Sequence, residues 1–312
     1  MATFQIVKNQ KFLLKTELRN FPLTFVNGLR RILLSQIPIV VLRGVEIITN
    51  TSQMPYEMLK HRMELLPVNV DPSDTQIIKN ASVHLEKTAR DYEIITTSDF
   101  EVRNGREHLL MHDRDLGTPL LFLRLKKDES VHLKASLALE KGSQVCTAAM
   151  SYHIDPVRVE HERKLLEEKG EDLRPFDNFY YQKCYSIDDI GRPNWIDLSV
   201  ESVGVLTSQD IMKLAVKELR SGVNEWMSQA VDHIAKEGDS YMIKLDVGGH
   251  TIGALIQEVM YHTGIQFVSY DIPHPLRPTL VIKFVTDKEP EKFLKEIHET
   301  IEEYCQIVEK GL

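Results

Sequence analysis

The chain has 312 residues, with 38 lysines and arginines against 46 aspartates and glutamates, so its net charge is −8. A protein that binds nucleic acid by itself usually has an excess of basic residues or a basic stripe on its surface. The sequence shows neither, so we expect no direct sequence-specific nucleic-acid contact. At 42% hydrophobic and 27% charged residues the composition is that of a globular chain. No apolar run approaches the ~18 residues needed to cross a bilayer, so no membrane partner is expected.

The cysteines Cys146, Cys184 and Cys305 are scattered along the chain, and no C-x-x-C pair occurs. This spacing argues against a disulfide framework and against a structural zinc or iron–sulfur site. The first residues also lack the charged-then-apolar layout of a signal peptide. We therefore expect an intracellular protein without a cofactor or a bound metal.

The first predicted elements are a strand, a helix and a second strand. Residues 4–18 have the apolar content of a strand, Pro22 can open a helix, and Pro38 ends it before a strand over residues 39–48. One apolar stripe follows the helical period in this segment. Its members are Phe25, Val26, Leu29, Ile32 and Leu33.

An insertion follows, over about residues 49–186. Residues 55–66 are predicted as a short helix, and residues 130–140 alternate strictly between apolar and polar, as a half-buried strand does. Further strands are expected near residues 75–86, 92–102, 119–127 and 145–154. A charged helix is predicted over 157–170, so the insertion is mainly β followed by a helix.

The chain then returns to a strand near 194–204 and a long helix from Thr207 to Gly238, with Thr207 and Asp210 as a possible capping box. Apolar residues recur in this helix at alternating spacings of three and four, the pattern of a coiled-coil seam. The seam comprises Val216, Leu219, Val223, Trp226 and Ala230.

The C-terminal segment repeats this plan. A strand over 241–247 is followed by the turn Gly248–Gly249, a helix that stops at Gly264, two strands over 265–272 and 279–285, and a helix opened by Pro290. The shorter helix carries the stripe Ile252, Leu255, Ile256, Val259 and Met260. The longer helix carries the seam Leu294, Ile297, Ile301, Tyr304 and Val308.

Each half thus has a sheet, a short helix and a long helix whose apolar seam it cannot bury alone. We predict an α+β fold in which the two halves pack on each other as a pseudo-dimer within one chain. The expected domains are 1–48 plus 187–238, the inserted 49–186, and 239–312. The residues expected to form the intrachain contact are Leu29, Leu33, Val216, Leu219, Val223, Trp226, Leu255, Val259, Leu294, Ile297, Ile301 and Tyr304.

Several motifs resemble the alpha-like subunits of multi-subunit DNA-directed RNA polymerase. "LRRILL", "HRMELLPV" and "VESVG" are similar to the large alpha-like subunit, and "HTIG" with "IPHP" is similar to the small one. Archaea and eukaryotes make these two subunits as separate chains that form a heterodimer. Their fusion in one chain resembles the arrangement in large nucleocytoplasmic DNA viruses. If the source is viral, the resemblance implies a location in the virion and the host cytoplasm; if it is a eukaryotic cell, it implies the nucleus.

The resemblance implies a non-catalytic assembly platform that docks the largest and second-largest polymerase subunits and small zinc-binding subunits, without a need to homodimerise. Arg30 and Arg31 interrupt an apolar helix surface where the family's dimer meets the second-largest subunit, so they are candidate interface residues. His61 and Arg62 have the same interpretation. The alternative for these side chains is an ordinary solvated surface.

Catalytic interpretations find little support in the residues. His250, His262 and His274 are twelve residues apart, which gives no tight ligand pair. "GGHTIG" lacks the G-x-G-x-x-G spacing and the lysine of a phosphate-binding loop. Asp113 and Asp115 are too few for a two-magnesium site. No catalytic residue is predicted; a free-standing dimerising adaptor and a metal-dependent hydrolase remain the alternative functions.

Overall fold

The computed structural model describes residues 1–106, 108–142 and 145–312. They form two compact units with mixed helices and sheets, the α+β class predicted from the sequence. Unit 1 comprises Met1–Leu33, Ala148–Glu201 and Ser208–Leu312, and unit 2 comprises Leu34–Thr147 and Ser202–Thr207. In the described residues, no helix is both long enough and apolar enough to cross a membrane.

The first sheet of unit 1 has the strand order β1-β2-β10-β9. Strands β1 (Thr3–Gln10) and β2 (Leu13–Arg19) form a hairpin, with Gln10 opposite Leu13, where the sequence had predicted one long strand. The prediction was wrong because polar residues at the loop do not interrupt the apolar content of the segment. β9 is Cys146–Tyr152 and β10 is Trp195–Ser202. Alternate residues of β2 and β10 are buried, which gives the sheet one apolar face.

The second sheet of unit 1 has the order β11-β12-β14-β13. Its strands are β11 (Ile234–Glu237), β12 (Ser240–Leu245), β13 (Phe267–Asp271) and β14 (Leu280–Val285). β11 was expected to be helix, because the long helix was predicted to run to Gly238. The helix instead ends at Ala230, and Gly238, at φ +61°, turns a hairpin between β11 and β12.

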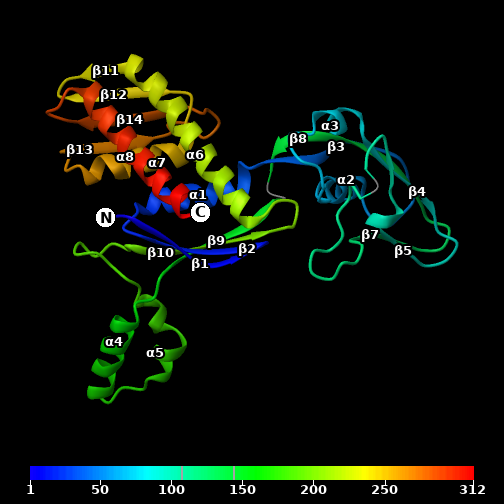
Figure 1. Ribbon diagram of the computed structural model, residues 1–312, viewed down its shortest axis with the longest axis horizontal. Helices are drawn as coiled ribbons and strands as arrows, with labels where there is room; N and C mark the ends of the chain where they lie inside the picture. The colour runs from blue at the N-terminus through cyan, green and yellow to red at the C-terminus, as the bar shows by residue number, and fades with distance from the viewer. Residues whose placement is uncertain (107, 143–144) are drawn as a thin grey trace. The chain divides into compact units, whose positions relative to one another are not determined.

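Helices α1 (Leu23–Ser35), α6 (Ser208–Ala230), α7 (Gly249–His262) and α8 (Pro290–Gly311) complete the paired part of unit 1. α6 packs along α8, and α7 lies on β13 and β14 (Figure 1). Each long helix also reaches the sheet of the other half, α6 at β12 and α8 at β1. The halves therefore share one core instead of touching at a flat boundary.

Unit 1 also contains α4 (Pro156–Glu168) and the short helix α5 (Arg174–Asn178). The carboxylate of Asp155 caps α4 by accepting a hydrogen bond from the Val157 amide at 2.9 Å. None of the residues of α4 is buried. This agrees with the charged helix predicted for the segment.

Unit 2 is mainly β, as predicted for the insertion. One sheet has the order β3-β8-β4-β6, and β5 pairs with β7. The strands are β3 (Pro38–Asn50), β4 (Ser82–Thr88), β5 (Glu93–Thr96), β6 (Glu101–Arg103), β7 (Leu121–Leu125) and β8 (Ser130–Lys141). Its helices are α2 (Tyr56–Glu64) and α3 (Thr75–Asn80); the strand predicted over 75–86 is thus helical in its first half. Ile77 and Ile78 of α3 both pack against the unit 2 core, which a strand with alternating faces does not allow.

The compact units divide the chain at different residues from the predicted domains. All of β3 lies in unit 2, although residues up to 48 were assigned to the first dimerisation domain. Residues 148–186 lie in unit 1 instead of the insertion, because β9 is hydrogen-bonded to β10 and joins the first sheet. Likewise β11 pairs with β12 of the second half, ahead of the predicted boundary at 238.

Candidate protein-interaction site

The seam between α6 and α8 is the largest contact between helices in unit 1. The α6 residues expected there are at most 1% exposed: Val216, Leu219, Val223 and Trp226. On α8, Leu294, Ile297 and Ile301 are also at most 1% exposed. Burying such side chains contributes about 1.5–3 kcal/mol each before the entropy of ordering is subtracted, so the seam is a large favourable contribution to the packing of unit 1.

Tyr304 departs from the predicted seam. The fully buried position is Cys305, and Tyr304 is half-buried. An α-helix advances 3.6 residues per turn, so a strict alternation of three and four drifts off the buried face, and α8 uses 301, 305 and 308. The Tyr304 ring instead contacts Phe21 and Phe25, with ring centroids 5.4 and 5.7 Å apart. It still joins the two halves, through the start of α1.

The shorter helices contribute a second apolar layer. Leu29 and Leu33 of α1 are 0% exposed, and Leu255 and Val259 of α7 are at most 2% exposed. The stripes predicted for both helices are the buried faces that the structure describes. Of the twelve residues on which the pseudo-dimer was predicted, eleven are therefore buried and Tyr304 is half-buried.

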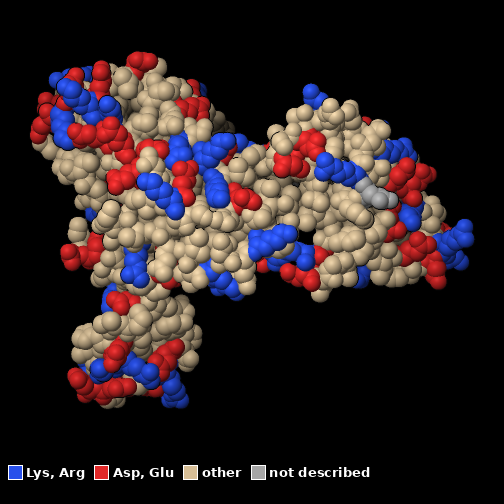
Figure 2. All heavy atoms as spheres, viewed as in Figure 1, with Lys and Arg blue, Asp and Glu red and all other residues tan. Residues whose placement is uncertain are grey.

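Polar contacts join the halves around this core. The Arg220 guanidinium of α6 donates to Glu302 at 2.8 Å and to Glu309 at 2.7 and 2.8 Å, and these bonds raise the pKa of Arg220 above its ordinary value. The His298 ring lies 2.6 Å from the side-chain oxygen of Asn224. The face of the molecule in Figure 2 carries acidic and basic side chains interspersed over these helices.

Two further contacts involve the first turns of α1 and α7. The Glu258 carboxylate accepts hydrogen bonds from the amides of Leu23 at 3.2 Å and Thr24 at 2.8 Å. These are amides that the first turn of α1 leaves without an intrahelical acceptor. In the other direction, Nε of Arg31 donates to the Thr251 hydroxyl at 2.9 Å.

The four residues predicted to contact other subunits have different environments. Arg30 is half-buried and its guanidinium donates to Asn27, one turn earlier on α1, at 3.0 and 3.1 Å. Arg31 is exposed and contacts Thr251, a role that the sequence did not predict. In unit 2, His61 is exposed, while Arg62 donates to the carbonyls of Phe122 and Leu121 and so ties α2 to β7. Their contact with other subunits stays a prediction.

The three histidines that first suggested a metal lie apart in the second half. His250 begins α7, with its ring edge-on to Tyr270. His262 ends α7, 3.7 Å from Glu258. His274 accepts a hydrogen bond from the Leu276 amide at 3.1 Å, which fixes a proline-rich turn. Each has a local structural role.

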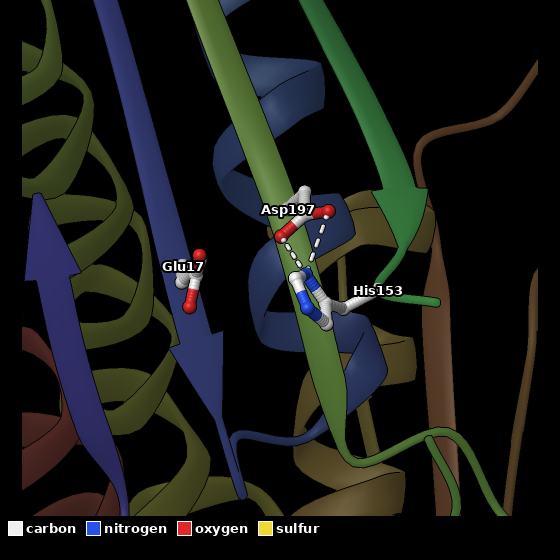
Figure 3. Close-up of side chains that lie close together, drawn as sticks. All are labelled: Glu17, His153 and Asp197. Atoms are coloured by element: carbon white, nitrogen blue, oxygen red, sulfur yellow. Dashed lines mark hydrogen bonds and ion pairs between the residues drawn. The ribbon is translucent and has the colours of Figure 1, made fainter. Parts of the chain in front are cut away.

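Among the described residues, one group of three has potential ligand atoms close together: Glu17, His153 and Asp197 (Figure 3). His153 Nδ1 is 2.9 and 3.1 Å from the Asp197 oxygens. Sequence reasoning could not find the group because it comes from β2, β10 and the end of β9.

The partners of this group favour a structural role. The His153 ring stacks on Trp195 with centroids 3.6 Å apart, and the Arg19 guanidinium lies 3.3 Å from the Trp195 ring. The Trp195 indole N–H donates to Glu17 at 3.1 Å, and Arg19 is 3.7 Å from the same carboxylate. Glu17 and Asp197 thus already have protein donors, and a positive charge is already present. A metal would have to displace these bonds.

Other potentially reactive groups are also held in structural contacts. Asp113 accepts hydrogen bonds from the amides of Asp115 and Leu116, and Asp115 pairs with Arg114, so this loop is a self-capped turn. Cys146 and Cys305 are buried, and burial raises the pKa values of their thiols to about 11 and about 12. Neutral buried thiols are poor nucleophiles.

The fold and its contacts therefore define a class: a protein-interaction protein whose two related halves dimerise within one chain. Comparison with known families agrees. The family model described as the RNA polymerase Rpb3/Rpb11 dimerisation domain matches residues 15–222, and a second model with the same description matches residues 240–311. The chain belongs to this RNA polymerase Rpb3/Rpb11 dimerisation family, and it is an alpha-like subunit of the Rpb3/Rpo3 type.

Individual relatives support the same family. The chain is 24% identical to the DNA-directed RNA polymerases I and III subunit rpac1 of Dictyostelium discoideum, over 61% of this chain and 71% of that one. It is 29% identical to the RNA polymerase II subunit RPB3 of Schizosaccharomyces pombe, over 45% and 55%. It is 32% identical to subunit Rpo3 of Pyrobaculum calidifontis, over 26% and 31%. The match thus spans under a third of the archaeal relative and about half of the fission yeast one.

Sequence reasoning missed the polar contacts between the halves. Glu258, Glu302 and Glu309 gave no local signal, because their partners lie up to 235 residues away along the chain. The parallel stripes of α1 and α7 carried a usable signal. Aligning the two helices on these stripes would have marked Arg31 and Glu258 as equivalent positions at the pairing surface.

Proposed function

We propose that this chain is a non-catalytic assembly platform of a DNA-directed RNA polymerase, in which a large and a small alpha-like subunit are fused. In this role the paired halves present a rigid surface to the largest and second-largest subunits. Small zinc-binding polymerase subunits complete the assembly, and the chain itself binds neither DNA nor a cofactor.

The observation that carries this proposal is the occurrence of two dimerisation-domain matches in one chain, over residues 15–222 and 240–311. The two matched regions contribute α6 and α8, which pack along each other. A heterodimer made from two chains needs both to meet at sufficient concentration. Fusion raises the effective concentration of one half around the other and keeps their ratio at one to one.

The outer side of α1 is the proposed contact with the second-largest subunit. Arg30 is half-buried and oriented by Asn27, so its rotamer freedom is already restricted before a partner binds. Preorganisation of this kind lowers the entropic cost of binding, and arginine is enriched at interfaces. Arg31 and, in unit 2, His61 are exposed candidates for the same role.

The cellular setting is a further part of the proposal. The fused arrangement suits a large nucleocytoplasmic DNA virus, with action in the virion and the host cytoplasm. In a eukaryotic cell the same subunit would work in the nucleus. A free-standing dimerising adaptor outside transcription is the alternative, because paired halves alone do not specify a third partner.

Affinity purification of the tagged chain from its native source tests the proposal. Mass spectrometry should identify both large polymerase subunits in stoichiometric amounts, and a tagged unrelated protein should recover neither. Recovery of the chain with other partners and without either large subunit would favour the adaptor. Turnover of a nucleotide or ester by the isolated chain would favour an enzyme.

A further inference from the structure

The two halves of unit 1 obey a pseudo-two-fold relation that can be followed residue by residue. Buried residues of α1 and α7 correspond at a constant separation in the chain, as do those of α6 and α8. The first set pairs Phe25 with Ile252, Leu29 with Ile256, Ile32 with Val259 and Leu33 with Met260. The second pairs Val216 with Leu294, Leu219 with Ile297, Val223 with Ile301 and Ala230 with Val308.

The polar contacts between the halves follow the same relation. On this alignment Arg31 is equivalent to Glu258, and Thr24 is equivalent to Thr251. The bond from Arg31 to Thr251 is therefore the symmetry mate of the bond from the Thr24 amide to Glu258. Each contact joins the last part of one short helix to the first turn of the other.

The long helices show the same correspondence. Arg220 is equivalent to His298, and Asn224 is equivalent to Glu302. The pair of Arg220 with Glu302 is thus the mate of the pair of His298 with Asn224, at 2.8 and 2.6 Å. Both helix pairs thus show the same exchange of equivalent contacts between the two halves, as a two-fold interface does.

The charges at these equivalent positions are not symmetric. The first half carries the arginines, Arg31 and Arg220, and the second half carries the carboxylates, Glu258, Glu302 and Glu309. In an interface of true two-fold symmetry each contact would be made twice by the same residues. We propose that these five side chains form a pairing code that selects a second half as the partner of each first half and rejects two like halves.

The physical consequence for two first halves is unfavourable. In such a pair Arg31 would take the place of Glu258 at the first turn of its copy's α1, and a guanidinium offers no acceptor to the amides there. In the unlike pair that place is taken by Glu258, whose carboxylate accepts from the amides of Leu23 and Thr24. The Phe25 and Val26 amides bond to the Pro22 carbonyl, so the first turn is satisfied only with the carboxylate in place.

A pair of two second halves is also unfavourable. Glu302 and Glu309 would lose Arg220, because the equivalent position in a second half is His298, and the carboxylates of both copies would gather at the interface. Arg220 is held by both carboxylates in the unlike pair, with side-chain exposures of 25%, 32% and 37%. Solvent screens partly buried charges less than fully exposed ones. Repulsion between like charges in a pair of like halves therefore lowers the affinity as well as the rate of association. The code deepens the dimerisation role within the proposed function.

The test uses the full chain, folded and then cut. A specific protease site inserted between Gly238 and Asp239, which are exposed in the β11–β12 turn, leaves the halves associated without a covalent link. Native mass spectrometry and dilution then give the affinity and the composition of the pairs. Glu258→Arg combined with Glu302→Arg tests the code, and Glu299→Arg, on the exposed side of α8, is the matched control.

The cut wild type and the control should form one-to-one pairs of unlike halves with affinities within threefold of each other. The double reversal should weaken the pair at least tenfold, since it removes a helix cap and an arginine–carboxylate pair. Exchange of the charges, Arg220→Glu with Glu302→Lys and Glu309→Lys, should recover the affinity to within about threefold of wild type. Recovery distinguishes charge pairing from simple loss of structure.

Equal affinity of the double reversal and the wild type would overturn the proposal. So would an exchange variant that pairs no better than Arg220→Glu alone. Should a reversal prevent folding, Glu258→Gln and Glu302→Gln remove the charges with almost no change of shape, and the same at-least-tenfold loss is expected for that pair of changes. The assay involves no polymerase, so a result that refutes the pairing code leaves the platform role untouched. Equally, failure to recover the large polymerase subunits would not refute the pairing code.

Discussion

Replacing Ile297 by alanine is the most direct perturbation of the pairing seam. Ile297 is 0% exposed in the middle of α8, the helix that packs along α6. Truncating a fully buried isoleucine loses its transfer free energy and leaves a cavity, at a typical cost of about 2–5 kcal/mol. If the seam holds the halves together, this free energy is lost from their association.

The effect can be measured on the intact chain and on the chain cut at Gly238. In domains of 150–250 residues each kcal/mol lowers the melting temperature by about 2–4 °C, so unit 1 should melt about 4–20 °C lower. In the cut chain the affinity of the halves should fall about 30-fold or more, at tenfold per 1.4 kcal/mol. Glu299→Ala, exposed on the same helix, should change stability by less than about 0.5 kcal/mol. A loss below 1 kcal/mol for Ile297→Ala would refute the packing argument.

Three further predictions follow from the described contacts. Arg30→Ala should leave the melting temperature unchanged yet reduce recovery of the second-largest subunit at least tenfold in a pull-down. Arg31→Ala should in addition weaken the pairing of the halves, because it removes the hydrogen bond to Thr251. Normal recovery of the subunit with Arg30→Ala would show that Arg30 is an ordinary surface residue. Burial raises the pKa values of Cys146 and Cys305, so the folded chain keeps these thiol protons at a pH where the unfolded chain, with the ordinary thiol pKa of 9.0, releases them. The free energy of unfolding should therefore fall as the pH rises above about 8.5, by up to about 1.4 kcal/mol per pH unit for each thiol. A flat profile between about pH 8.5 and pH 11 would contradict this. Elemental analysis of the pure chain should find no stoichiometric zinc or iron, and the His153→Ala variant should give the same result. If the wild type instead held one metal ion per chain that resists chelation, and the variant held none, Glu17, His153 and Asp197 would be metal ligands.

The local pattern of apolar, proline and glycine residues was sufficient to predict most helices and strands of unit 1. The stripes of α1 and α7 were readable because an amphipathic helix repeats its buried face every 3.6 residues whatever it packs against. Proline and glycine marked several ends in the same way: Pro22 and Pro290 open helices, and Gly264, at φ +76°, follows the end of α7. These are properties of the backbone that need no tertiary partner.

The errors arose where a tertiary partner decided between two local possibilities. The segment after Ala230 was expected to continue as helix, but Ile234–Glu237 pairs with β12 and becomes an edge strand. Halves that are expressed separately should therefore be divided after Ala230, because a division at 238 would place β11 and its partner strand β12 on different fragments before folding. A cut at Gly238 made after folding leaves β11 already paired with β12. At Tyr304 the drift of the helix moved the seam to Cys305, and Phe21 and Phe25 provided a place for the tyrosine ring.

The two similar halves, each with an apolar seam that it cannot bury alone, are evident from the amino-acid sequence, and its motifs indicate the polymerase family. This is so because hydrophobic periodicity and turn chemistry are written in neighbouring residues. Which polar side chains contact one another depends instead on how the strands and helices pack. Glu258 reaches the first turn of α1, and Glu17, His153 and Asp197 come together from separate strands, because pairing of strands and helices brings distant positions within hydrogen-bond distance. A carboxylate has the same local appearance whether it ends in water or caps a helix more than 200 residues away; the difference lies in the packing.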